Sequence, residues 1–271
     1  MVDFAPSWEA ATRSFVGIVA LGLVAWVASV WRRDASLADR FWPGFMATAA
    51  CVDASLALPL GARGAWMLAL ASIWAARLCV FITWRNWGHG EDRRYAAMRA
   101  EHGESFAWQS LYLVFGLQAV LAWIISLPLL IGIGSAAPLT VLDATGVALA
   151  AIGIVIEAIA DAQMARFRGD PATRGQVMDR GLWAYSRHPN YFGEACVWWG
   201  LALMACAACP AWSPWTLVAL LSPVLMTWLL LRISGVSLLE KDIADRRPGY
   251  REYVARTNAF LPGPRRKAPT P

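Results

Sequence analysis

The sequence predicts an all-α protein, a polytopic membrane bundle of seven transmembrane helices with the N-terminus outside and the C-terminus in the cytoplasm. Composition, the spacing of apolar segments and the distribution of basic residues support this fold class. Of the 271 residues, 58% are hydrophobic and only 16% are charged, and the mean hydropathy is +0.45. Soluble domains contain about 25% charged residues. The composition therefore excludes disorder, a disulfide scaffold and an ordinary soluble fold.

The apolar segments have the length that a membrane helix needs, which is about 20 residues. Seven windows qualify, at approximately 14–31, 41–60, 65–84, 108–133, 139–160, 191–209 and 214–237. Many tryptophans lie at window ends, where their amphipathic rings favour the headgroup layer. We expect a single membrane domain over residues 1–271, in which residues 239–271 form a cytoplasmic C-terminal segment.

The basic residues predict the orientation of these windows. All but three of the 24 Lys and Arg residues, namely Arg13, Arg63 and Arg77, fall within or beside alternate connections. Such connections are cytoplasmic by the positive-inside rule. The first window is preceded by acidic Asp3 and Glu9 and followed by Arg32 and Arg33, which indicates a retained anchor and not a cleaved signal peptide.

The net charge of +5 does not indicate nucleic-acid binding, because the positive charges border apolar segments. Lipid headgroups or an anionic cofactor explain them better. The five cysteines include one Cys-x-x-Cys pair, Cys206 and Cys209, with no second pair and no nearby histidine. Packing therefore explains the cysteines better than redox chemistry, and no metal site is expected.

Ionisable residues at membrane depth are functional candidates, because burying them in lipid is unfavourable. Two of them, Glu157 and Asp161, are four residues apart and so share one helix face. Their like charges need a cation or hydrogen-bond donors opposite. The alternative for each candidate is an internal ion pair with Arg77 or Arg232. The full set is Asp53, Arg77, Glu157, Asp161, Glu194 and Arg232.

The segment Gly181-Leu-Trp-Ala-Tyr-Ser-Arg-His-Pro-Asn-Tyr-Phe-Gly-Glu194 has the highest density of polar groups. Pro189 predicts the first turn of a helix, and Arg187 and His188 lie beside that helix N-terminus. This arrangement favours an anion such as phosphate. A second polar cluster runs over residues 239–253. Its alternative interpretation is a solvated amphipathic tail, with Arg246 and Arg247 contacting anionic lipids.

Three segments together resemble the uncharacterised bacterial branch of the steroid 5-alpha-reductase family. They are Arg85-Asn-Trp-Gly-His-Gly-Glu-Asp-Arg-Arg-Tyr95, Leu117-Gln-Ala-Val-Leu-Ala-Trp-Ile-Ile-Ser-Leu-Pro128 and Gly181 to Glu194. A shorter pattern, Arg-His-Pro-x-Tyr with a later Glu240 and Tyr250 to Tyr253, is also similar to isoprenylcysteine carboxyl methyltransferases and phospholipid methyltransferases. That shorter pattern alone does not distinguish reduction from methylation.

The resemblance implies a seven-helix enzyme of a bacterial inner membrane that holds NADPH near its cytoplasmic face. It also implies membrane lipids as surroundings and a lipophilic small-molecule substrate. No G-x-G-x-x-G motif is present, which excludes a Rossmann module. The cofactor-binding residues that the resemblance implies, together with their motif neighbours, are Glu157, Asp161, Arg168, Tyr185, Arg187, His188, Asn190, Tyr191, Glu194, Arg232, Glu240 and Tyr250.

The implied reaction is NADPH-dependent reduction of a carbon–carbon double bond conjugated to a carbonyl group. In the resembling reductases a Glu of the second helix and a Tyr of the third helix polarise that carbonyl. The matching positions here are Asp53 and Trp74. An apolar bundle favours the protonated form of Asp53, which can then donate to the substrate oxygen. Trp74 donates only through its indole N–H, so the substrate stays open between a steroid-like and a polyprenyl-like lipid.

Two other functions remain open at this point. An S-adenosylmethionine-dependent methyltransferase of a lipid or prenylated substrate would use the Arg-His-Pro segment, but it explains the acidic face of Glu157 and Asp161 less well. A non-enzymatic lipid-binding bundle would use its intramembrane charges only as ion pairs. The sequence also leaves open whether NADPH is preferred over NADH. The cytoplasmic segments contain many arginines, and the sequence does not show which of them would bind the 2′-phosphate.

Overall fold

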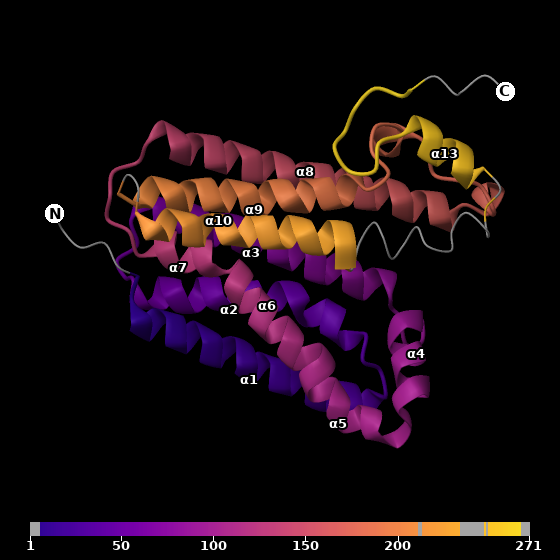
Figure 1. The fold of residues 1–271 in the computed structure, drawn as a ribbon, viewed down its shortest axis with the longest axis horizontal. Helices are drawn as coiled ribbons and strands as arrows, with labels where there is room; N and C mark the ends of the chain where they lie inside the picture. The colour runs from indigo at the N-terminus through magenta and orange to yellow at the C-terminus, as the bar shows by residue number, and fades with distance from the viewer. Residues whose placement is uncertain (1–5, 211–212, 234–246, 248, 267–271) are drawn as a thin grey trace. The chain divides into compact units, whose positions relative to one another are not determined.

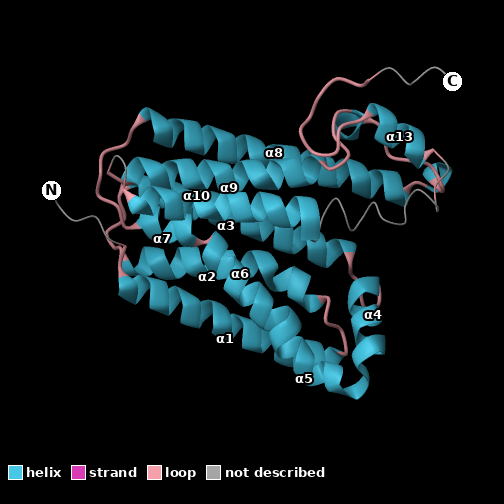
Figure 2. Ribbon diagram, in the orientation of Figure 1, coloured by secondary structure: helices cyan, strands magenta, loops and turns pink. Residues whose placement is uncertain are grey.

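The structure is a computed structural model that describes residues 6–210, 213–233, 247 and 249–266. Over this part of the chain every regular element is a helix (Figure 2). The chain divides into two compact units, which we describe separately. The N-terminal unit comprises Met1–Val147 and Leu201–Ser222, and the C-terminal unit comprises Ala148–Gly200 and Pro223–Pro271. The expectation of one domain stays a prediction.

The long helices lie at the predicted windows (Figure 1), but α8 extends to Gly169, beyond the window 139–160, and α4 lies between two windows. The long ones are α1 (Trp8–Arg32), α2 (Leu37–Leu56), α3 (Ala62–Arg85), α8 (Val141–Gly169), α9 (Pro189–Ala208) and α10 (Pro214–Trp228). The run between α3 and α8 comprises α4 (Arg93–His102), η1 (Gly103–Ser105), α5 (Phe106–Ser110), the π-helix η2 (Leu111–Gly116), α6 (Leu117–Ile125) and α7 (Leu127–Ile133). The remaining elements are η3 (Pro171–Thr173), η4 (Gly181–Ala184), the π-helix η5 (Leu229–Ile233) and α13 (Tyr250–Arg256).

Six helical stretches of the described chain are long and apolar enough to cross a membrane, judged by length and composition. They are Trp8–Arg32, Ala62–Arg85, Arg93–Ile133, Val141–Gly169, Pro189–Ala208 and Pro214–Ile233. Large apolar side chains such as Val27, Ile73, Val80 and Leu217 are exposed on them, as expected where lipid is the solvent. The protein is thus a multi-pass helical membrane protein.

Helix α2 is not among these six stretches. It spans 20 residues and matches the predicted window 41–60, shifted by four residues toward the N-terminus. Its sequence contains Asp39, Arg40 and Asp53, and ionised groups lower the hydropathy of any window that includes them. Whether α2 adds a seventh crossing therefore depends on how these polar groups are satisfied.

One end of the N-terminal unit is held by a buried guanidinium group. The Arg63 side chain donates from Nε to Asp143 Oδ1 at 2.6 Å and from Nη2 to Asp143 Oδ2 at 2.9 Å. It also donates to Ser135 Oγ at 3.1 Å and to the Ala137 carbonyl at 3.0 Å. Because these partners satisfy the buried charge, Arg63 ties α3 to the α7–α8 connection and the start of α8.

A second polar cluster joins the start of α2 to α4. The Tyr95 hydroxyl donates to Asp39 Oδ1 at 2.6 Å, and Arg94 Nη2 contacts Asp39 Oδ2 at 2.6 Å. Glu91 accepts from Arg99 Nη2 at 2.8 Å and from the Ala35 N–H at 2.7 Å. The connection that follows α3 is therefore partly helical and packs against the start of α2. We call these contacts the α4 clamp.

The pKa of Glu91 in the α4 clamp differs from that of an ordinary glutamate. Burial acts to raise its pKa, but the hydrogen bonds from Arg99 and the Ala35 N–H, together with the Arg99 charge, favour the carboxylate. The net result is a pKa below the ordinary glutamate value. Glu91 is thus an anion that the folded state stabilises.

Candidate functional site

The sequence-predicted cofactor residues all fall within the C-terminal unit, whereas Asp53 and Trp74 belong to the N-terminal unit. Glu240 lies outside the described residues. The other eleven cofactor candidates are distributed over α8, the 170–188 connection, α9, η5 and α13. The site is therefore described as a feature of the C-terminal unit.

Two glycines bring α8 and α9 into backbone contact. A Cβ atom on Gly193 would lie 2.7 Å from the Gly153 carbonyl oxygen and 2.8 Å from the Glu157 nitrogen. A Cβ on Gly153 would lie 2.5 Å from the Gly193 carbonyl oxygen. Such close approach is possible only without side chains, as in other membrane helix pairs. It places Glu157 of α8 beside the first turns of α9, which carry Asn190 and Glu194.

Three acids near this contact are buried. The exposed fractions are 2% for Glu157, 6% for Asp161 and 7% for Glu194. None of the three is without an interaction partner, as the unfavourable burial of a free carboxylate requires. Burial of both Glu157 and Asp161 agrees with the shared helix face that their spacing predicts. The C-terminal unit thus contains a buried acidic cluster formed by two adjacent helices.

The 170–188 connection packs against the same part of α8. Trp183 Nε1 donates to the Ala160 carbonyl at 3.0 Å, and the Leu182 N–H donates to Gln163 Oε1 at 2.9 Å. Gly181 has φ +57°, a left-handed conformation that favours glycine, and a Cβ there would lie 2.6 Å from the Gln163 side chain. Gly181 therefore lets the chain turn tightly against α8 just before the Arg-His-Pro segment.

Helix α9 begins at Pro189, as the sequence predicts. Next to it, His188 is buried, its N–H donates to Ser186 Oγ at 3.1 Å, and its ring stacks on Tyr191 with centroids 5.4 Å apart. Asn190 is half-buried, and its Oδ1 has no hydrogen-bond partner within the described residues. Asn190 is thus a polar group near the buried acids with an acceptor still available.

The described C-terminal segment docks onto the same connection and is not a solvated tail. The Tyr253 hydroxyl is buried and donates to the Trp183 carbonyl at 2.6 Å. Arg187 donates from Nη1 to the Thr257 carbonyl at 2.6 Å, so its side chain holds this segment. Tyr250 is also buried and lies edge-on to Tyr253, with centroids 5.8 Å apart.

The remaining candidates differ in exposure. Tyr185 is exposed, although its backbone carbonyl accepts from the Gly263 N–H at 3.0 Å. Arg232 lies in η5 with an exposed side chain. Arg168 lies in the last turn of α8. Of these three residues, only Arg168 lines the cavity at the C-terminal end of α8.

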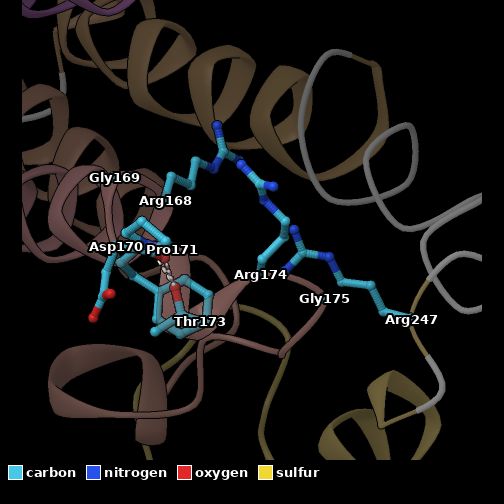
Figure 3. Close-up of a pocket in the computed structure, with 9 residues that line it drawn as sticks. Arg168, Gly169, Asp170, Pro171, Thr173, Arg174, Gly175 and Arg247 are labelled. Atoms are coloured by element: carbon cyan, nitrogen blue, oxygen red, sulfur yellow. Dashed lines mark hydrogen bonds between the residues drawn. The ribbon is translucent and has the colours of Figure 1, made fainter.

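A cavity of about 170 Å³ opens at the C-terminal end of α8. Figure 3 shows the side chains of Arg168, Arg174 and Arg247 converging on one side of it. Asp170 also lines it, but its carboxylate accepts from the Ala172 N–H at 2.9 Å and points away from the three guanidinium groups. The complete lining is Phe167, Arg168, Gly169, Asp170, Pro171, Thr173, Arg174, Gly175 and Arg247. We call it the arginine cavity.

The two proposed catalytic residues lie in the core of the N-terminal unit. Asp53 is 4% exposed and accepts from Ser14 Oγ at 2.5 Å, while its Oδ2 has no hydrogen-bond partner within the described residues. Trp74 is completely buried. Asp53 therefore retains an unsatisfied oxygen, and Trp74 is enclosed by its neighbours.

Sequence reasoning missed two sets of residues. Arg174 was counted only as a cytoplasmic positive charge, and Arg247 only as a possible lipid contact, because their approach depends on tertiary structure. The Asp39–Tyr95 pair was also missed, although Tyr95 ends one of the resemblance segments. The available sequence signal was an acidic residue elsewhere in the chain, Asp39, that could accept a hydrogen bond from the Tyr95 hydroxyl.

These features define a multi-pass helical membrane protein whose C-terminal unit contains a buried acidic cluster and, at the C-terminal end of α8, a basic cavity. The chain belongs to the family described as "Protein of unknown function (DUF1295)", whose sequence profile matches residues 25–257. It is 25% identical over 270 residues to the "Uncharacterized protein C594.04c" of Schizosaccharomyces pombe, covering 89% of this chain and 76% of that protein. No solved structure matches the chain significantly.

Proposed function

We propose that this protein is an integral membrane NADPH-dependent reductase of a conjugated carbon–carbon double bond in a lipophilic, steroid-like or polyprenyl-like substrate. The proposal includes membership of the wider steroid 5-alpha-reductase family, seven membrane crossings, an outer N-terminus and a location in a bacterial inner membrane. The observation that carries it is the set of buried acids on α8 and α9, Glu157, Asp161 and Glu194, beside the half-buried Asn190.

The residues present suit a dinucleotide cofactor. Carboxylates accept hydrogen bonds from ribose hydroxyls in other dinucleotide sites, and Asn190 Oδ1, which has no partner among the described residues, offers a further acceptor for a carboxamide N–H. The arginine cavity supplies positive charge suited to phosphate. S-adenosylmethionine contains no phosphate and carries a positive sulfonium, so the arginine cavity favours reduction over methylation.

Bound NADPH would supply a hydride for the β-carbon of the unsaturated carbonyl compound, and the α-carbon would take up a proton. The chain's own residues position the two reactants and keep water out. Asp53 is proposed to donate a hydrogen bond from its protonated carboxyl group to the carbonyl oxygen, where negative charge develops. Trp74, which is completely buried, is assigned to shaping the substrate side through its indole ring and N–H.

Ligand-dependent thermal unfolding of the purified, detergent-solubilised protein tests the proposal. We expect NADPH, but not S-adenosylmethionine, to raise the unfolding temperature of the wild-type protein. Glu194→Ala and Asn190→Ala are expected to abolish that rise while leaving the ligand-free protein folded. Asp53→Asn should lower turnover and leave NADPH binding unchanged. Stabilisation by S-adenosylmethionine and not by NADPH would show that the reductase assignment is wrong.

A further inference from the structure

The arginine cavity brings together three groups that repel each other. Guanidinium groups stay protonated at any physiological pH, so Arg168, Arg174 and Arg247 bring three positive charges to one small concavity. Within the described residues no carboxylate contacts Arg174 or Arg247. An anion among the guanidinium groups would offset their mutual repulsion, and guanidinium pairs well with phosphate because it donates two parallel hydrogen bonds.

The connection that carries Arg174 is held in place by its own hydrogen bonds. Asp170 accepts from the Ala172 N–H at 2.9 Å, and Thr173 Oγ1 donates to the Asp170 carbonyl at 2.9 Å. The Arg174 N–H donates to the Pro171 carbonyl at 3.2 Å. Since the backbone is fixed on both sides of η3, Arg174 emerges toward the cavity from a defined turn and not from a freely moving loop.

Arg247 is attached to the same connection although it lies far along the chain. Its Nη1 donates to the Gln176 carbonyl oxygen. Next to it, a Cβ atom on Gly249 would lie 3.7 Å from Val177 Cγ2, an ordinary packing distance. The guanidinium group of Arg247 keeps further N–H donors, since Gln176 takes only one of its five. The backbone of Arg174 and the side chain of Arg247 are therefore both held by the 170–188 connection at the arginine cavity.

The volume of the cavity limits the size of the ligand group that it can enclose. Pockets that enclose a whole drug-sized ligand have volumes of roughly 300–1,000 Å³, whereas the arginine cavity measures about 170 Å³. It therefore accommodates one end group of a larger ligand. A terminal phosphate monoester carries a charge of about −1.5 to −2 at pH 7, which suits several guanidinium groups better than a singly charged phosphodiester.

We propose that the arginine cavity binds the 2′-phosphate of NADPH and so makes the protein select NADPH over NADH, with Arg174 and Arg247 as the discriminating residues. This inference rests on the proposed function. The rest of the dinucleotide is common to both cofactors, so residues that contact only the 2′-phosphate change selectivity without changing NADH binding.

The experiment measures dissociation constants of NADPH and NADH for the full-length purified protein and for Arg174→Gln, Arg247→Gln and the double variant. Arg180→Gln is the matched control, because Arg180 lies in the same connection, is exposed and does not line the cavity. The soluble probes 2′,5′-ADP and 5′-AMP, which differ only in the 2′-phosphate, are measured as competitors. Ligand-free thermal unfolding verifies that each variant is folded.

We expect each single variant to bind NADPH about tenfold more weakly, the double variant to lose more, and NADH binding to stay unchanged. In the double variant, the preference for 2′,5′-ADP over 5′-AMP should disappear as well. If the double variant keeps the wild-type ratio of NADPH to NADH affinity, the 2′-phosphate inference is wrong while the reductase proposal stands. A wild-type protein that binds both dinucleotides equally overturns the inference in the same way.

Two further results separate the inference from the proposed function. Wild-type protein that binds neither NADPH nor NADH removes the reductase proposal itself, and the inference with it. The other source of a phosphate monoester is a lipid headgroup, tested with nanodiscs that contain phosphatidic acid or only phosphatidylcholine. Phosphatidic acid that stabilises the wild type, fails to stabilise the double variant and does not compete with NADPH would assign the cavity to lipid and overturn the inference.

Discussion

At the scale of single residues, buried and partly buried charges are paired in specific ways. Arg63 and Asp143 form a bidentate pair with additional hydrogen bonds, which is the arrangement that makes a buried pair tolerable. Glu91 has two donors in the α4 clamp, the Arg99 side chain and the Ala35 N–H. Asp53, by contrast, accepts one hydrogen bond, from Ser14, and its other oxygen has no partner in the described chain. That difference separates structural acids from a candidate reactive one.

The lowered pKa of Glu91 predicts how stability depends on pH. A group whose folded-state pKa is depressed stabilises the folded state above its unfolded pKa, about 4.3 for glutamate, and loses that contribution as pH falls through the folded value. Glu91→Gln should therefore lower the unfolding temperature at pH 7. The difference from wild type should shrink below about pH 4.3, measured by intrinsic fluorescence in detergent.

Glu101→Gln is the control for this measurement, because Glu101 is an exposed acid of α4. It should leave the unfolding temperature unchanged across the same pH range. A constant difference between wild type and Glu91→Gln at pH 7 and at pH 3.5 would contradict the proposed role of the carboxylate.

At the scale of secondary-structure elements, the contact between α8 and α9 decides where the acidic cluster lies. The two helices meet backbone to backbone at Gly153 and Gly193, so any side chain at these positions would separate them. Separation would move Glu157 away from Glu194 even though neither acid is altered. The candidate site therefore depends on two residues that have no functional groups.

Gly193→Ala tests this dependence. The added Cβ would lie 2.7 Å from the Gly153 carbonyl oxygen, so the helices must shift, and we expect a loss of roughly 1–3 kcal/mol in stability with weaker NADPH binding. Gly169→Ala on the same α8 is the control, because nothing lies within 4 Å of its added Cβ. It should be neutral or stabilising by about 0.5–1 kcal/mol. Equal unfolding temperatures for the two variants would contradict the close contact.

At the scale of the whole molecule, the number of membrane crossings decides the relative location of the two termini. Six stretches satisfy the length and hydropathy of a crossing, and α2 has the length but contains three charged residues, Asp39, Arg40 and Asp53. Asp39 and Arg40 lie near the first turn of α2, close to the headgroup layer, where charged side chains reach water. Only Asp53 is then a charge at depth, and the proposal of seven crossings counts α2 as one of them.

Reporter fusions to the two ends of the chain test this count. Seven crossings place the termini on opposite sides, so an N-terminal reporter active only outside and a C-terminal reporter active only in the cytoplasm should both give a signal. Replacing Arg32 and Arg33 by Gln is expected to weaken the orientation, whereas replacing the exposed Arg13 is not. Termini on the same side would contradict seven crossings and favour six.

The sequence by itself determined the helical class, the approximate ends of the long helices, the start of α9 at Pro189 and the burial of Glu157 and Asp161. These are local properties, because the thickness of a bilayer, the ring of a proline and the period of a helix act on neighbouring residues. A solvated tail at residues 239–253 was an alternative prediction, and amphipathic spacing alone does not show whether such a segment packs against the rest of the protein.

Only the tertiary structure decided which distant groups meet. It brought Arg247 to Arg174 at one cavity, Tyr253 to the Trp183 carbonyl, and Tyr95 to Asp39. Arginines are numerous in this chain, and their side chains are long, so sequence spacing gives no means of choosing the two that converge. That choice is made by the packing of α8, η3 and the C-terminal segment, since contacts between remote parts of a chain depend on how its helices fit together and not on the properties of either part alone.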